Sequence, residues 1–199
     1  MSQQYTNELT TDVLERLRQP PFTDEFLSEL EPQSRQSLVA EMESMLQRPI
    51  LHIFRGATIG SLTRHGGVIR ETSGKSTLDG HYSARVGDKV VYPDGREATI
   101  ICGAGKGRVM QGESMALVGS MLDNGDEIIS TPQGCQMFVF REGDALPDGF
   151  LTVPGDKHWW RWKAIFFSRE IVPSVAVKLS PVLKTPNFSG DHRRGKAIK

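Results

Sequence analysis

The sequence has too few cysteines and too little charge of one sign to fit several common classes of protein. Its 199 residues include two cysteines, Cys102 and Cys135, which are too few for the disulfide scaffold of a small secreted domain. We expect both to be small buried side chains. Lysine plus arginine and aspartate plus glutamate each number 24, so the chain lacks the basic excess of a general nucleic-acid binder.

Long hydrophobic runs are also missing. No stretch approaches the roughly 20 apolar residues that a membrane-spanning helix needs. The first residues, Met1–Tyr5, lack the basic start and apolar core of a signal peptide. We therefore expect a protein without a membrane span that is cytoplasmic when made and that uses another route if it is exported.

Recognisable catalytic and nucleotide-binding motifs are absent too. The five histidines do not form a His-Glu-x-x-His motif, and there is no Gly-x-Ser-x-Gly elbow. The glycine-rich runs Ser73–Thr77 and Gly103–Gly107 lack the following helix that a phosphate-binding loop requires. Asp156 and His158 are close in sequence, but two such residues at a turn are weak evidence for acid–base catalysis. The sequence therefore predicts no enzyme, with residues 141–199 left open.

The chain does contain a repeat, which runs from Arg64 to Thr131. Two copies align without a gap at a period of 32 residues, and a third begins at Asp126 and is incomplete. The aligned pairs are Val68 with Ile100, Gly80 with Gly112, Ala84 with Ala116, Val86 with Val118 and Gly87 with Gly119. Short β-branched pairs separated by glycines are typical of short strands and tight turns. The pattern predicts a mainly β unit with a pseudo-threefold axis, and the turn signals Tyr92–Gly95 and Asp123–Asp126 would lie together at one end.

This repeat resembles the PAAR-repeat family. Thr63–Ile69 is similar to that family's Thr-x-His-Gly-Gly run, and Tyr82–Val90 is similar to its Pro-Ala-Ala-Arg run followed by Val-Gly-Asp. Ala84 and Arg85 match the name motif, whereas Tyr82 and Ser83 depart from it. The resemblance covers roughly residues 55–135. It implies a conical unit that caps and sharpens the trimeric spike, the valine-glycine repeat protein, of a type VI secretion system.

The resemblance also implies a partner and a route of export. The partner would be the trimeric spike protein, with one copy of this chain per trimer, because three quasi-equivalent repeats can meet three equivalent strand ends. The predicted spike contacts end the repeat copies and are Arg85, Val86, Val118 and Gly119. The contractile spike would carry the tip into target cells. The tip of a phage-like contractile particle is an alternative with the same geometry.

A zinc ion is a further implication, because many members of the family hold one near the apex through three histidines and a cysteine. His65 matches one of these ligands, whereas Tyr92–Gly95 and Asn124–Gly125 stand where the other ligand motifs would be. Asp94, Asp123 or another histidine could complete a site, but carboxylates and amides are a poor ligand set for structural zinc. We therefore expect no cofactor or a zinc at His65, and without zinc an apex held by hydrogen bonds.

Residues 1–50 have the pattern of a helical N-terminal arm. Thr11–Asp12, Thr23 and Pro32 mark the starts of three predicted helices, and Pro49 ends the last one. The third helix carries an apolar stripe made of Leu38, Val39, Met42, Met45 and Leu46. This stripe either packs within the protein or docks an effector, adaptor or chaperone.

The predicted strands Ile50–Phe54 and Cys135–Phe140 bound the β unit, which we place at residues 51–140. Residues 141–199 form a predicted short β-rich extension, with a strand-like run at Phe150–Pro154. The aromatic run at residues 158–167 either packs against the extension or forms a platform for cargo. A second hypothesis is that this extension is a small toxin, an enzyme that the unit delivers.

Overall fold

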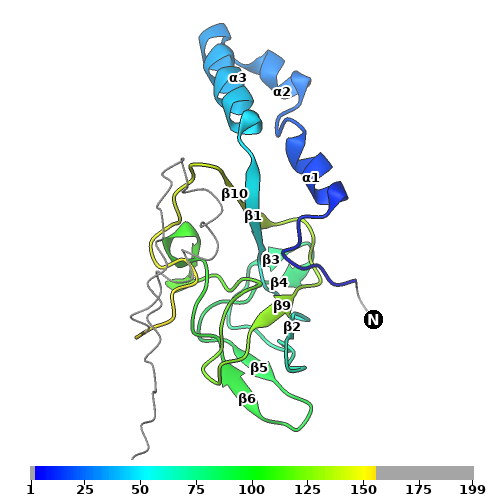
Figure 1. Cartoon of the computed structure of the whole chain (residues 1–199), viewed down its shortest axis with the longest axis vertical. Helices are drawn as coiled ribbons and strands as arrows, with labels where there is room; N and C mark the ends of the chain where they lie inside the picture. The colour runs from blue at the N-terminus through cyan, green and yellow to red at the C-terminus, as the bar shows by residue number, and fades with distance from the viewer. Residues whose placement is uncertain (1–2, 156–199) are drawn as a thin grey trace, which may run out of the picture.

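The computed structural model describes residues 3–155 of the chain (Figure 1). Within these residues short antiparallel strand pairs follow three N-terminal helices, so the mainly β prediction is confirmed. The helices are α1 Thr11–Arg18, α2 Asp24–Glu29 and α3 Pro32–Gln47. The strands are β1 Ile50–Arg55, β2 Leu62–Thr63, β3 Thr77–Leu78, β4 His81–Tyr82, β5 Lys89–Val91, β6 Glu97–Thr99, β7 Val109–Met110, β8 Glu113–Ser114, β9 Ile128–Ser130 and β10 Met137–Arg141, with the 3-10 helix η1 Gly105–Gly107 before β7.

Three alanines form a closed ring of backbone hydrogen bonds at the centre of the strand pairs. The amide of Ala57 donates to the carbonyl of Ala116, that of Ala84 to Ala57, and that of Ala116 to Ala84, each at 2.9 Å. All three side chains are completely buried. Because every member of the ring makes the same two bonds, the three segments are related by rotation. The predicted pseudo-threefold axis is therefore confirmed.

The same turn follows each alanine of the ring. Three positions after the alanine the chain has a glycine with positive φ, which is +88° at Gly60, +93° at Gly87 and +100° at Gly119. The side chain of the next residue, Ser61, Asp88 or Ser120, accepts a hydrogen bond of 2.9 Å from the amide that opens the turn. Glycine recurs here because it adopts positive φ without strain.

The structure places the starts of the three copies at residues that differ from those predicted from the 32-residue period. They start at Gly56, Ser83 and Met115 in the structure, so the first copy begins before Arg64, where the predicted repeat begins. A fixed period missed the first copy because Ala57 and Ala84 are closer in sequence than the 32 residues that separate Ala84 from Ala116. The incomplete copy predicted at Asp126 is the returning half of the copy that starts at Met115.

One isoleucine from each copy fills the space around the ring. Ile69, Ile100 and Ile128 are fully buried, and their amides donate to the turns of their own copies at 3.0–3.1 Å. The three side chains therefore form a layer that all copies share. A buried apolar layer of this kind supplies most of the stability available to strands as short as these.

The entry strand β1 and the exit strand β10 close the structure by pairing antiparallel. Ile50 lies opposite Arg141, and Arg55 lies opposite Met137. Under this pair the rings of Phe54, Phe140 and Phe150 meet edge to face, with centroids 5.0–5.8 Å apart. The sequence predicted both strands but not their pairing, because partners so far apart along the chain share no local pattern.

The helical arm begins and ends close to the predicted residues. Thr23 caps α2 by accepting the Phe26 amide, and Pro32 occupies the first position of α3. The cap of α1 is Thr10, one residue before the predicted cap. Figure 1 shows the arm beyond β1 and β10, at the end of the molecule opposite the β5–β6 hairpin. Because α2 and α3 bury none of their residues, the arm covers little of the strands.

Two buried arginines attach the N-terminal region to the strands. Arg141 donates to the carbonyls of Leu17 and Arg48, at 2.8 and 3.0 Å, where α1 and α3 end. Carbonyls at helix C-termini carry partial negative charge, which favours a cation. Arg55 donates to the Thr6 carbonyl at 2.7 Å. Residues 3–9, which the sequence placed in the arm, therefore lie along the strands.

After β10 the described chain continues to Gly155 without another strand. The strand expected at Phe150–Pro154 is reduced to one parallel bridge between Phe150 and Gly103. Leu151 has a φ of +47°, which interrupts extended backbone. The aromatic run at residues 158–167 and the rest of the predicted extension lie outside the described residues.

Two smaller expectations concern the cysteines and the membrane. Cys102 is buried as expected, whereas Cys135 is exposed because it lies on the loop before β10 rather than in the strand. In the part of the chain that the structure describes, no helix has the length and apolar character needed to cross a membrane.

Candidate functional site

Three strand pairs leave the alanine ring in one direction and form what we call the base. They are β1–β10, β3–β4 and β7–β8, and each meets the ring at the residue before an alanine. There the amides of Gly56, Ser83 and Met115 donate to the carbonyls of Gln136, Ser76 and Arg108 at 3.2, 2.8 and 3.0 Å. Two pairs are closed hairpins, whereas β1–β10 is open and continues into the arm.

The closed hairpins of the base end in two-residue turns, Asp79–Gly80 and Gln111–Gly112. All four residues have φ between +52° and +89°, the backbone of a type I′ hairpin turn. Next to these turns Tyr82 of β4 is 50% exposed and Val109 of β7 is 56% exposed. Each closed hairpin therefore presents an apolar side chain to solvent.

The opposite end, which we call the apex, consists of three tight turns. Their glycine amides close back onto the chain at 3.0–3.1 Å, from Gly66 to Thr63, from Gly95 to Tyr92 and from Gly125 to Leu122. The three glycines have φ of +82° to +85°, and a Cβ at any of them would meet no atom within 4 Å. Two of these turns were predicted and are confirmed, whereas the turn of Gly66 was not recognised.

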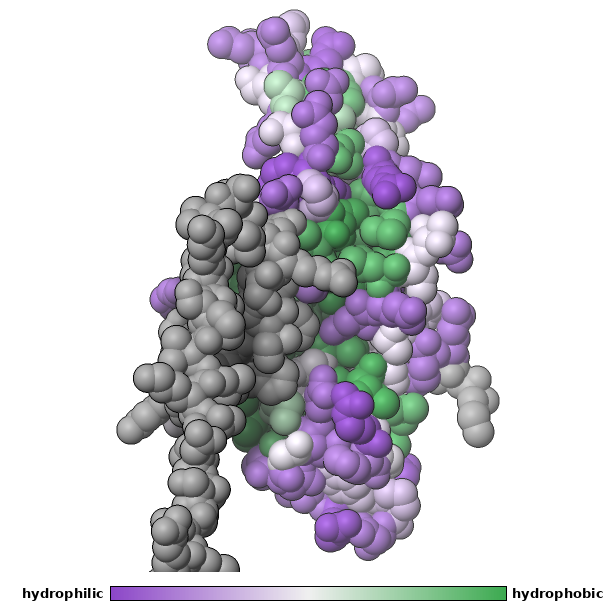
Figure 2. Space-filling model, viewed as in Figure 1, coloured by the Kyte–Doolittle hydropathy of each residue, from purple (hydrophilic) through white to green (hydrophobic). Residues whose placement is uncertain are grey.

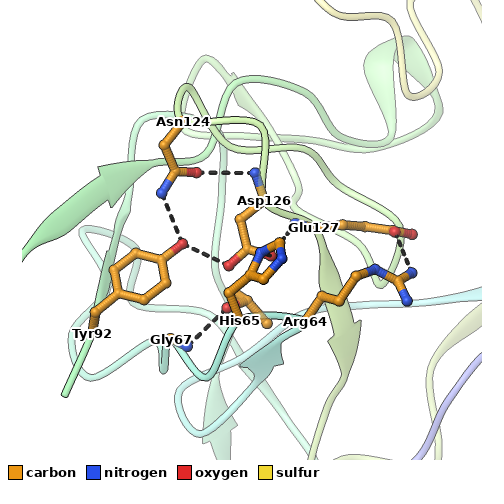
Figure 3. Close-up of polar contacts among 8 residues, drawn as sticks. Arg64, His65, Gly67, Tyr92, Asn124, Asp126 and Glu127 are labelled. Atoms are coloured by element: carbon orange, nitrogen blue, oxygen red, sulfur yellow. Dashed lines mark hydrogen bonds and ion pairs between the residues drawn. The ribbon is translucent and has the colours of Figure 1, made fainter.

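Side chains from all three apical turns meet at the carboxylate of Asp126 (Figure 3). Its Oδ1 lies 2.9 Å from Nδ1 of His65 and accepts the Glu127 amide at 2.8 Å, while Oδ2 accepts the Tyr92 hydroxyl at 2.6 Å. Asn124 donates to the Tyr92 oxygen at 2.9 Å and accepts the Asp126 amide at 3.0 Å. We call His65, Tyr92, Asn124 and Asp126 the apical cluster.

The carboxylate at the centre of this cluster is ionised although its side chain is only 2% exposed. Burial acts to raise the pKa of Asp126, but hydrogen bonds from Thr63, Tyr92, the Glu127 amide and His65 outweigh it and lower the pKa to about 2. Burial also raises the pKa of Tyr92, so its hydroxyl keeps the proton that it donates. The cluster therefore holds a buried charge whose two oxygens are satisfied by hydrogen bonds.

The residues of the apex do not fit zinc. His65 is present, but its neighbours are a phenol, an amide and one carboxylate, whereas structural zinc takes four ligands that are mainly thiolates and imidazoles. Among residues 3–155 no group of three or more His, Cys, Asp or Glu side chains is placed to hold a metal. Asp94 binds Arg96 in its own turn, and Asp123 accepts the Thr99 amide, so neither carboxylate joins His65.

Arg85 and Val86, two of the predicted spike contacts, lie on the repeat turn of the second copy, between base and apex. The Arg85 guanidinium donates to Ser73 Oγ at 2.7 Å and to the carbonyls of Met110 and Gln111, both at 3.3 Å. It therefore ties the tip of the β7–β8 hairpin to the repeat turn that follows Ala84. Val86 is half-buried. Contact of these residues with a spike stays a prediction.

Val118 and Gly119, the other two predicted contacts, border a groove of about 440 Å³ on the side of the strands. Val118 is buried, and its carbonyl accepts Nδ2 of Asn7 at 2.8 Å. The lining is mostly apolar and comes from β1, the third copy and residues 146–153, with Asn7, Glu8 and Arg64. Figure 2 shows hydrophobic side chains in the middle of one face, interrupted by hydrophilic ones. Spike contact through Val118 and Gly119 also stays a prediction.

Sequence reasoning missed the base and most of the apical cluster. An Asp-Gly pair between strand-like residues is a strong hairpin signal, so Asp79–Gly80 could have been found. No such signal exists for the side-chain contacts of the apical cluster, because Tyr92 and Asp126 lie on different turns and only the fold brings their side chains into hydrogen-bond contact. The sequence places Tyr92 in a turn and marks it as a departure from a zinc motif, but it does not predict the hydrogen bond to Asp126.

Comparison with known proteins agrees with this geometry. The family model of the PAAR motif matches residues 59–130. The matched segment contains the three apical turns and both closed hairpins of the base. No curated protein is significantly similar to the chain.

Proposed function

Residues 59–130 belong to the PAAR-repeat family, and from this premise we propose that the chain is a structural tip that caps the trimeric spike of a type VI secretion system. One copy would sit on each spike trimer. The chain would be made in the cytoplasm and leave the cell at the end of the spike. Its role would be mechanical and without a catalytic step, because a rigid apex concentrates force on a small area.

The observation that supports this proposal is the threefold base. A single chain can match a threefold partner only by repeating its contact surface, and the base repeats one strand pair three times around the alanine ring. Short strand pairs also offer edges to which strand ends of a partner can add. The exposed side chains of Tyr82 and Val109 would then be the apolar anchors of the contact.

Co-purification with the trimeric spike protein of the same genome, followed by mass measurement of the intact complex, tests the proposal. We expect three spike chains and one copy of this chain. A well-folded chain that forms no complex would contradict the spike-tip proposal and favour the toxin hypothesis for residues 141–199.

Point variants then test where the spike binds. The double variant Tyr82→Glu with Val109→Glu places charge on both closed hairpins, so we expect it to lose the complex. Pro93→Glu is the control, because it places one carboxylate on an exposed apical turn, away from the base. If the double variant binds the spike as well as the wild type does, the base is not the contact, and variants of Arg85 and Val86 become the next test.

We further propose that the helical arm docks an effector, adaptor or chaperone. The arm projects from the open pair β1–β10, and its Phe22 and Phe26 rings stack at 5.2 Å while staying 37% and 44% exposed. Phe22 precedes α2 and Phe26 lies in its first turn, and exposed stacked aromatic side chains of this kind are suitable anchors for a partner.

The double variant Phe22→Ser with Phe26→Ser tests the arm without disturbing residues 3–9. We expect it to form the spike complex normally and to lose binding of the effector or chaperone encoded beside this chain, measured by calorimetry with the purified partner. Unchanged binding of that partner would rule out the stacked rings as its contact.

A further inference from the structure

The apical cluster joins parts of the chain that are distant in sequence. His65 comes from the turn of the first copy, Tyr92 from the second, and Asn124 and Asp126 from the third. His65 and Tyr92 contact the Asp126 carboxylate directly, and Asn124 is linked to it through the Tyr92 hydroxyl. The carboxylate thus takes the position of a common acceptor for three turns, which is the position that a structural metal would take in a small repeat unit.

The polar groups that face this carboxylate are linked by hydrogen bonds. Asn124 donates to the hydroxyl of Tyr92, and that hydroxyl donates to Oδ2 of Asp126. Oδ1 accepts the Glu127 amide and lies within bonding distance of His65. The Asn124 carbonyl oxygen accepts the Asp126 amide and closes the cycle. Chains of bonds in which each donor also accepts strengthen one another inside a protein.

The same arrangement is unsuited to a cation. Both oxygens of Asp126 already face donors, and the phenol of Tyr92 and the amide of Asn124 are not ligands that zinc selects. The imidazole of His65, the one residue shared with the family's ligand set, is 69% exposed and makes its contact at the edge of the cluster. A metal would have to displace bonds that are already made, without gaining a tetrahedral set of nitrogen and sulfur ligands.

We propose that the apex of this protein is held by a metal-independent lock, in which the buried carboxylate of Asp126 replaces the zinc that the family implies. The lock joins the three apical turns through Tyr92 and His65 and keeps the tip ordered whatever the supply of zinc. The lock is a property of the chain without its partner, so its test does not depend on spike binding.

The first experiment uses the full-length wild-type chain, purified from cells grown with added zinc. We expect less than about one zinc per ten chains by elemental analysis, since structural zinc sites are normally filled stoichiometrically. The melting temperature should also be the same in EDTA and in excess zinc chloride. About one zinc per chain, or a melting temperature that falls in EDTA, would overturn the proposal.

The second experiment compares three variants of the same chain. Asp126→Ala leaves buried donors without an acceptor, so we expect the melting temperature to fall by on the order of 5–10 °C. Asp94→Ala is the matched control, because it removes an exposed carboxylate from a neighbouring apical turn, and we expect a fall of less than about 2 °C. His65→Ala should lower the melting temperature by less than about 3 °C, because one exposed contact is lost.

The outcomes separate a carboxylate lock from a metal site. If Asp126→Ala fails to fold, Tyr92→Phe provides a milder test, since it removes only the hydroxyl that donates to Oδ2, and we expect a fall of about 2–5 °C. Equal melting temperatures for Asp126→Ala and Asp94→Ala would show that the cluster does not hold the apex. A large fall for His65→Ala together with loss of bound zinc would show a metal site.

Discussion

The two ends of the repeat unit are built on the same threefold backbone but differ in how their elements are joined. At the apex, side chains from three turns meet at the buried carboxylate of Asp126. At the base, the hairpins β3–β4 and β7–β8 keep Tyr82 and Val109 exposed. The apex is thus closed by contacts among its own side chains, whereas the base leaves apolar side chains exposed to solvent.

This difference shows what repetition supplies and what it does not. The alanine ring repeats the backbone three times, which makes both ends threefold. The apical cluster then breaks the symmetry, because histidine, tyrosine and aspartate occupy corresponding turns and only their combination satisfies the carboxylate. A surface that must match a threefold partner needs the symmetry, whereas a tip that contacts nothing of its own assembly can abandon it.

The largest effect should come from removing the layer that both ends share. Ile100→Ala deletes a fully buried side chain next to the ring, so we expect a loss of about 3 kcal/mol in the free energy of unfolding. Ile101→Ala, at the half-buried neighbouring position, should cost less than about 1.5 kcal/mol. Urea denaturation followed by circular dichroism measures both. Equal losses would mean that the isoleucine layer does not support the two ends.

Glycine variants compare the packing of the two ends. A Cβ on Gly67 would lie 2.5 Å from Cγ1 of Val90 and 2.8 Å from Oγ1 of Thr63, so Gly67→Ala should destabilise by about 2–3 kcal/mol through overpacking. At the base, Gly80 has a φ of +78° and open space around it, so Gly80→Ala should cost only about 1 kcal/mol of backbone strain. Thermal unfolding of the two variants checks the order, which would be reversed if the base were the more tightly packed end.

Acid should weaken the apex by protonating Asp126. Its pKa is lowered to about 2 in the folded protein, so its contribution is fully present above the ordinary carboxyl pKa of about 4 and is lost as the pH falls through about 2. We expect wild type to exceed Asp126→Asn in stability by on the order of 2 kcal/mol at pH 7, with the difference shrinking between pH 4 and pH 2. Denaturation at several pH values measures this, and a constant difference would exclude the carboxylate charge as its cause.

The smallest effect on stability is expected at the base. Tyr82→Ser removes a half-exposed side chain from a closed hairpin, so the free energy of unfolding should change by less than about 0.5 kcal/mol. A loss above 1 kcal/mol in urea denaturation would show that the hairpin packs within the chain, and would weaken the case for a free contact surface there.

The three predicted helices, the β repeat and two apical turns were all accessible from the sequence, because caps, prolines and Asp-Gly or Asn-Gly pairs act on their immediate neighbours. The frame of the repeat was not accessible. Gly56–Ser61 is a full copy, but it falls outside the 32-residue period and shares little more than its alanine and its glycine with the others. The pairing of β1 with β10 was missed for a related reason, since it joins the two ends of the unit.

The sequence by itself determined the local elements and the presence of a threefold repeat, because glycine and proline restrict φ and ψ one residue at a time and repeated restrictions give repeated turns. Only the tertiary structure decided that His65, Tyr92 and Asp126 meet, and that Tyr82 and Val109 stay exposed. The physical reason is that a buried carboxylate is stable only where donors from other turns surround it. That arrangement depends on how three separated segments close around the ring of Ala57, Ala84 and Ala116.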